Sequence, residues 1–246
     1  MRNSGFAASL LGLTVFSIAM GYLECSVVIY LRELYYPSGF NFPLVPMLDG
    51  IAYTEVFREI STMIMLLSAA FLTGKNIRQK FAWFIYCFAV WDIFYYIFLK
   101  LILNWPDSPL TWDVLFLIPV VWTGPVIAPV IISSTMIVMA GIILHFERKV
   151  TWFEIKWPVF ILIISGSVLV FLSFIGDFSI FMLKHYPPVD FFHADIIRMA
   201  MQHYIPANFN WWLFISGELI IISGIYRLYL VYRKSNRDPA FSAGSL

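Results

Sequence analysis

The sequence predicts an all-α integral membrane protein, a single domain over residues 1–246 built as a bundle of six transmembrane helices with both termini in the cytoplasm. The first observation behind this prediction is composition. Of the 246 residues, 61% are hydrophobic, 19% aromatic and 13% charged, and the mean hydropathy is +0.81, whereas soluble domains are roughly half apolar and a quarter charged. The second observation is that six segments reach the roughly 20 mainly apolar residues that a spanning helix needs.

The six predicted spans follow one another along the whole chain. The first begins soon after Arg2 and resembles a secretory signal at its start, but its apolar stretch runs to Leu31 and no small-x-small cleavage site follows a short apolar core. We therefore expect it to be retained as a span. In chain order the spans are predicted at 6–31, 53–73, 81–103, 112–144, 158–176 and 211–232.

Basic residues divide the connections into two groups, and this third observation predicts the topology. Three connections are rich in Lys and Arg, and by the positive-inside rule they face the cytoplasm. The loops 32–52, 104–111 and 177–210 are poor in basic residues, so we expect them on the outer face of a plasma membrane or bacterial inner membrane. The basic residues are Lys75, Arg78 and Lys80 between spans two and three, Arg148, Lys149 and Lys156 between spans four and five, and Arg233, Lys234 and Arg237 in the tail.

The fourth predicted span is too long and too interrupted to be one straight helix. Its outer part contains Pro119, Gly124, Pro125 and Pro129, and each proline removes a backbone donor and crowds the preceding turn. We expect a helix that is kinked or broken there. Broken helices often build binding sites in transporters, and a packing kink without a ligand is the alternative.

The long outer loop contains a further helical pattern. In the stretch VDFFHADIIRMAMQHY, apolar residues recur at helical spacing among Asp190, His193, Asp195 and Arg198. This pattern predicts a short amphipathic helix near 189–204 that rests on the outer surface of the membrane. Its role would be that of a lid or of a plain interfacial helix.

Ionisable residues inside the predicted spans point to a polar site. A charged side chain at bilayer depth costs about 2.5 kcal/mol or more, so acids at that depth are expected to face one another, a base or water. Glu24 lies within the first span and Asp92 near the middle of the third. We predict a pocket in the outer half of the bundle whose substrate- or ion-binding residues are Glu24, Glu55, Glu59, Asp92, Asp113 and Glu218.

Bases and tyrosines near these acids are expected to support the pocket, although structural roles compete with that interpretation. Bases near the membrane rim often snorkel or pair across helices. Glu55 and Asp113 stand at predicted helix starts, where an acid favours the helix dipole. The supporting residues are Arg32, Arg58, Lys100, Tyr95 and Tyr96.

Composition and motifs also limit the chemistry. A net charge of +1 gives no reason to expect nucleic acid as a partner. The four histidines form no HxxxH or HxxHH group, which argues against the di-iron sites of membrane hydroxylases and desaturases. A cluster of carboxylates alone would favour a hard cation, but no spaced motif supports a metal site, so none is predicted. Catalytic residues and cofactors stay unknown.

Three functions fit the predicted pocket. In the first, the protein binds or conducts a proton, a cation or a small basic substrate through Glu24, Glu59 and Asp92, with the broken fourth span as a gate. In the second, it is an accessory subunit of a larger membrane complex, or a homo-oligomer, and the pocket only stabilises the bundle. In the third, it is a membrane enzyme that uses paired carboxylates as acid and base on a lipid or quinone-like substrate. The lipid bilayer is the partner common to all three.

Overall fold

The structure, a computed structural model, describes the chain apart from residues 1–2, 119, 149–156, 189–190, 192 and 238–246. Within the described residues, six helices are long and apolar enough to cross a bilayer, which confirms the predicted all-α bundle. They are α1 (Asn3–Tyr35), α2 (Asp49–Thr73), α3 (Ile77–Leu103), α4 (Ile127–Glu147), α5 (Trp157–His185) and α7 (Trp211–Arg237). The shorter elements are the strands β1 (Trp112–Phe116) and β2 (Trp122–Pro125) and the helix α6 (Ala194–Met201).

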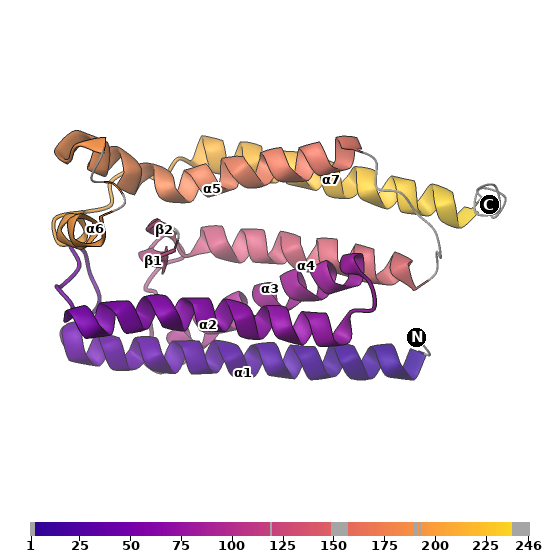
Figure 1. The fold of residues 1–246 in the computed structure, drawn as a ribbon, viewed down its shortest axis with the longest axis horizontal. Helices are drawn as coiled ribbons and strands as arrows, with labels where there is room; N and C mark the ends of the chain where they lie inside the picture. Colours follow the sequence, from indigo (N-terminus) through magenta and orange to yellow (C-terminus); the bar gives the residue numbers. More distant parts are fainter. Residues whose placement is uncertain (1–2, 119, 149–156, 189–190, 192, 238–246) are drawn as a thin grey trace.

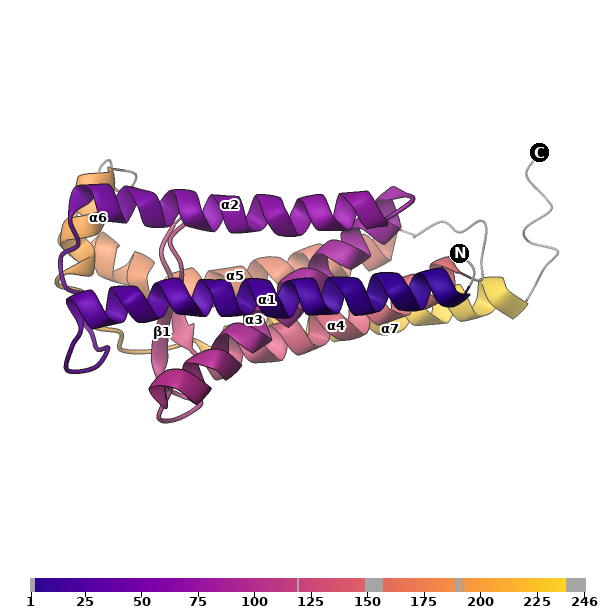
Figure 2. The ribbon, with the colours of Figure 1, turned by 90° about the horizontal axis from the view of Figure 1, so that it is seen from below.

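The long helices form two groups that meet at α4. In one group α5 packs along α7, and in the other α3 packs against α1, α2 and α4, while α4 also contacts α7. Figure 1 shows α5 and α7 as one layer and α1 and α2 as the opposite layer, and Figure 2 shows α1 and α2 side by side from below. α6 lies at one end of the bundle, here called the loop end, and the β1–β2 hairpin lies between the helices in the half nearer that end. The start of α1 and the end of α7 lie at the other end, the terminal end. That the terminal end is cytoplasmic stays a prediction, and Lys149 and Lys156, on which it partly rests, lie outside the described residues.

The segment before α4 differs from the prediction. Strands β1 and β2 pair antiparallel, with Trp112 opposite Pro125 and Asp113 opposite Gly124, so the predicted span 112–144 is wrong at its outer end and the helix begins at Ile127. Pro125 stands in β2 and Pro129 in the first turn of α4, where the missing N–H removes no helical hydrogen bond. Pro119 lies outside the described residues. A helix of 21 residues therefore follows a hairpin, and the kink at the prolines stays a prediction.

Gly124 explains why β2 can lie so close to α5. A Cβ atom added at this glycine would stand 3.1 Å from ring carbons of both Phe174 and Phe209, which is tighter than ordinary van der Waals contact. The strand therefore packs its backbone directly on these aromatic rings. This contact positions the hairpin between the α5–α7 pair and the other helices.

Capping interactions define the ends of α3. At its start the side chain of Asn76 accepts a hydrogen bond of 2.9 Å from the backbone N–H of Gln79, which satisfies one of the free donors of the first turn. At its end Asn104 adopts a left-handed conformation, with φ of 52°, as is common where a helix stops. The side-chain amide of Asn76 also donates to Glu147 over 2.8 Å, so the start of α3 is tied to the end of α4.

A buried tyrosine anchors the loop end. The Tyr204 hydroxyl donates to Asp177 of α5 over 2.7 Å and lies 3.0 Å from the hydroxyl of Thr123 in β2. Burial, reinforced by the neighbouring Asp177 carboxylate, raises the pKa of the Tyr204 phenol, so the hydroxyl keeps the proton that it donates. α6 precedes this anchor within the segment 189–204, where an amphipathic helix was expected. Asp190 lies outside the described residues.

Two facing glycines allow α5 and α7 to touch through their backbones. A Cβ atom added at Gly166 would stand 2.6 Å from the carbonyl oxygen of Gly217, and one added at Gly217 would stand 2.8 Å from the carbonyl oxygen of Gly166. Any side chain at either position would therefore force the helices apart. Small residues at such crossings are typical of membrane helices, because close packing stabilises their association.

We expect Gly166→Leu to destabilise the protein by about 1–3 kcal/mol, the usual cost of overpacking, because the α5–α7 contact leaves no room for a side chain. Gly176→Leu is the matched control, since Gly176 is also in α5 but an added Cβ would meet nothing within 4 Å. Thermal unfolding of the detergent-solubilised protein measures both. An equal fall in melting temperature for the two variants would contradict the packing argument.

Candidate functional site

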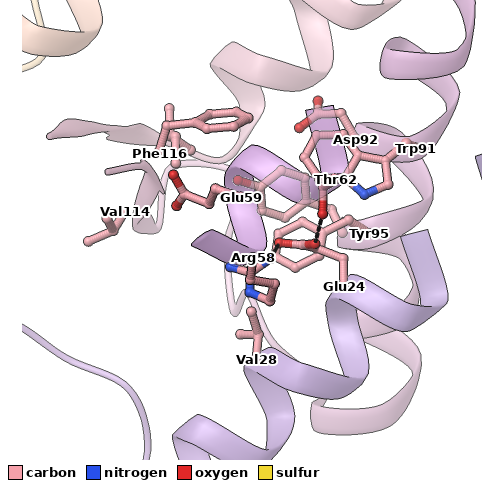
Figure 3. A pocket seen from close by; sticks show the side chains of 12 residues that line it. Glu24, Val28, Arg58, Glu59, Thr62, Trp91, Asp92, Tyr95, Val114 and Phe116 are labelled. Atoms are coloured by element: carbon pink, nitrogen blue, oxygen red, sulfur yellow. Dashed lines mark hydrogen bonds and ion pairs between the residues drawn. The ribbon is translucent and has the colours of Figure 1, made fainter. Parts of the chain in front are cut away.

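A small polar cavity lies between α1, α2, α3 and β1. Its volume is about 60 Å³, which is room for a few water molecules. Three of the predicted carboxylates, Glu24, Glu59 and Asp92, belong to its wall. Each stands ten or eleven residues from the loop end of its own helix, or about 15 Å at the rise of an α-helix. Figure 3 shows the wall, which is formed by Glu24, Val28, Arg58, Glu59, Thr62, Trp91, Asp92, Tyr95, Tyr96, Val114, Leu115 and Phe116.

Glu24 shares one cation with Glu55. The guanidinium of Arg58 forms an ion pair with Glu24 across the α1–α2 interface and one of 2.8 Å with Glu55, one turn away on its own helix. The second oxygen of Glu24 accepts a hydrogen bond of 3.3 Å from Thr62 (Figure 3). Glu55 is buried, stands well inside α2 and does not cap the helix. The carboxylate that interrupts the first span is therefore compensated by a base from the second.

Glu59 is held by the backbone of the hairpin. The N–H of Leu117 donates to both carboxylate oxygens, over 3.2 Å and 3.1 Å. Leu117 directly follows β1, where the strand pairing ends, so its N–H is free to point at α2. No cation among the described residues forms an ion pair with Glu59, although the side chain is buried.

Asp92 is held by a hydroxyl group from the next helix. The Ser133 hydroxyl of α4 donates to it over 2.8 Å, and both residues are buried. Within the described part of the chain Asp92, like Glu59, has no basic partner. These two acids differ in this respect from Glu24 and Glu55, whose charge Arg58 offsets in part.

Asp113 belongs to a separate cluster nearer the loop end. The expectation that it opens a helix is wrong, since it is the second residue of β1. It pairs with Arg32 over 3.3 Å and accepts a hydrogen bond of 3.3 Å from Tyr96. The Arg32 guanidinium also lies over two aromatic rings, 3.7 Å from the centroid of Trp105 and 4.5 Å from that of Phe40. These contacts fix the hairpin to α1 and α3.

Lys100 and Glu218, like Arg32, Glu55 and Asp113, lie outside the cavity wall. Lys100 is exposed and donates to the carbonyl oxygens of Asn104 and Pro106, over 3.2 Å and 2.9 Å, so it caps the end of α3. Glu218 of α7 is buried and accepts a hydrogen bond of 3.0 Å from Thr135 of α4. Neither residue belongs to the wall of the cavity.

Several wall residues were not predicted from the sequence. Thr62 lies one turn beyond Arg58 and Glu59 on α2, so spacing from a predicted acid was the available signal. Leu117, which lies outside this wall, was signalled by nothing in the sequence, because its contribution is a backbone N–H that only the hairpin exposes. The hairpin residues Val114, Leu115 and Phe116 were assigned to a helix and for that reason were missed.

The arrangement favours a small positively charged occupant. Four carboxylates, of Glu24, Glu55, Glu59 and Asp92, stand in or beside the cavity with the single guanidinium of Arg58. Charges in an interior of low dielectric interact strongly, so an excess of negative charge there requires a proton or cation. Among the residues that the structure describes, no group of three or more His, Cys, Asp or Glu side chains could hold a metal ion.

Comparison of the chain with protein-family models, with curated proteins and with solved structures gives no match.

Replacing Arg58 by Met tests its part in compensating two acids. We expect a loss of stability of about 3–5 kcal/mol, since removing one partner leaves buried charge unpaired. Adding Glu24→Gln and Glu55→Gln to the same protein should restore most of the loss. The melting temperature in detergent is the measurement.

The control for this prediction is Lys100→Met, which removes a base that only caps its own helix. It should lower the melting temperature far less than Arg58→Met. If the two single variants lose equal stability, or if the triple variant is no better than Arg58→Met, the three side chains do not form the interdependent set described.

Proposed function

We propose that this multipass membrane protein binds or conducts a proton or a small cation at the cavity between α1, α2, α3 and β1. The observation that carries the proposal is the pair of buried acids, Glu59 and Asp92, that face one cavity and have only hydrogen-bond donors as partners among the described residues. Ionisable groups kept at membrane depth despite their cost commonly mark the path of a substrate or ion. We place the site in the outer half of the bilayer.

The size of the cavity narrows the substrate class. About 60 Å³ is well below the roughly 300–1,000 Å³ typical of sites for small organic ligands. A small basic organic substrate would require the hairpin or α2 to move. A proton or an inorganic monovalent cation fits without such a change.

The second candidate, a membrane enzyme acting on a lipid-like substrate, is favoured by a neighbouring apolar cavity. It has a volume of about 180 Å³ and lies between α2, α6 and the residues that follow β1, with Leu44, Val56, Val121 and Met201 in its wall. Leu117 also belongs to this wall, and its N–H is the donor to Glu59. In this cavity an acyl chain would lie against Leu117, whose N–H binds the Glu59 carboxylate. That carboxylate could act as an acid or a base.

Reconstituted vesicles test the first proposal. We expect the unaltered protein to move protons or a monovalent cation, and Glu59→Gln or Asp92→Asn to reduce this flux by roughly tenfold or more. The reason is that one charge interaction at 4 Å is worth about 4 kcal/mol at an effective dielectric constant of 20, and about 1.4 kcal/mol already changes an equilibrium tenfold. Dyes sensitive to pH, Na⁺ and K⁺ report the flux.

Glu218→Gln is the matched control, because Glu218 is a buried membrane carboxylate outside the cavity wall. Its flux should equal that of the unaltered protein. The proposal is lost if vesicles with the unaltered protein move none of these ions, or if the variants at Glu59 and Asp92 conduct as well as Glu218→Gln.

A further inference from the structure

The cavity presents a hydrogen-bond donor as well as acids. Trp91 is 5% exposed, and its indole nitrogen has no hydrogen-bond partner in the part of the chain that the structure describes. In Figure 3 this nitrogen points toward Thr62 and Glu24 across the cavity wall. A buried N–H that finds no acceptor costs free energy, so the natural occupant is expected to supply an acceptor to Trp91.

Tyr95 adds a hydroxyl group to the cavity wall. Tyr95 belongs to the wall, and its ring contacts that of Tyr96 at 4.9 Å between centroids. A phenol hydroxyl both donates and accepts. The wall therefore contains donor groups from α3 together with carboxylate acceptors from α1, α2 and α3.

Neither a lone cation nor an anion meets both demands. A bare metal cation or an alkylammonium group satisfies Glu59 and Asp92 but has no lone pair to accept from the indole N–H of Trp91. An anion would accept from Trp91 but would be repelled by the carboxylates. Water accepts and donates at once, and the cavity has room for a few water molecules.

We propose that the cavity holds a small cluster of water molecules that bridges the Trp91 indole N–H to the carboxylates of Glu59 and Asp92, and that the species transferred there is the proton. In each step a hydronium ion in the cluster gives a proton to a carboxylate, which leaves a neutral carboxyl group and a water molecule. The reverse step returns the proton to water and restores the carboxylate. Atoms and charge balance, and no other reactant is needed. This inference rests on the proposed function and narrows its substrate class.

Trp91→Phe tests the proposal, because it keeps an aromatic ring and removes the donor. Vesicles with a pH-sensitive dye inside and a K⁺ diffusion potential set by valinomycin would report proton uptake. We expect uptake by Trp91→Phe to fall roughly tenfold, the effect of losing one hydrogen bond that acts in the transfer. The unaltered protein should show no Na⁺ flux in a parallel assay with a Na⁺ dye.

Trp122→Phe is the matched control. Its indole nitrogen likewise has no partner within the described residues, but Trp122 is outside the cavity wall and packs on the rings of Phe171 and Phe174. Uptake by this variant should be unchanged. If Trp91→Phe does not accumulate in the membrane, Tyr95→Phe is the substitute variant, because it removes the Tyr95 hydroxyl group. Trp122→Phe is again its control.

The outcomes separate this inference from the proposed function. Equal uptake by the Trp91 and Trp122 variants, with Tyr95→Phe also unchanged, overturns the water cluster. Flux of Na⁺ or K⁺ in place of protons, still abolished by Glu59→Gln, also overturns it but leaves the proposed function intact. The absence of any flux from the unaltered protein overturns both.

Discussion

The cost of placing a charged group in hydrocarbon determines how the half of this bundle nearer the loop end is built. Apart from Glu55, each buried acid there takes its partner from another element of the fold, so the groups that relieve the cost also fasten the elements together. One base, Arg58, joins α1 to α2, and hydroxyl groups of α4 reach to α3 on one side and to α7 on the other. The interactions are Arg58 with Glu24 and Glu55, Arg32 with Asp113, Ser133 with Asp92, Thr135 with Glu218, and the Leu117 N–H with Glu59.

The hairpin depends on the same constraint. Non-helical backbone at membrane depth is tolerated only where protein or water satisfies its polar groups. Here β1 and β2 satisfy each other, and the first N–H beyond β1 is taken by Glu59. Glycine at position 124 lets the hairpin lie against α5, and Arg32 holds it on the opposite side through Asp113. The irregular segment is thereby enclosed by the helices on both sides.

Hydropathy predicted the helices well because length and apolar content alone decide which segments can span a bilayer. It failed at residues 112–126, where a continuous apolar run has no period that separates a strand from a buried helix. Depth along each helix predicted that Glu24, Glu59 and Asp92 belong to one pocket in the outer half of the bundle. Depth along a helix does not show to which side of the helix a residue points. The sequence therefore could not show that Glu218 lies outside the cavity wall. Nor could the sequence predict the ion pair between Arg32 and Asp113, which are 81 residues apart.

The acids of the bundle fall into two classes by the kind of partner they have. Glu24, Glu55 and Asp113 contact a guanidinium, and such pairs are complete without a ligand. Glu59, Asp92 and Glu218 contact only neutral donors, which orient a carboxylate but leave its charge in place. Because an uncompensated charge in this interior is unfavourable, a proton or cation at Glu59 and Asp92 would stabilise the junction of α2, α3, α4 and the hairpin. Without that proton or cation, the Leu117 N–H and the Ser133 hydroxyl are the groups that relieve the charge of the two carboxylates, and a hydrogen bond to an ionised carboxylate is stronger than one to a neutral carboxyl group.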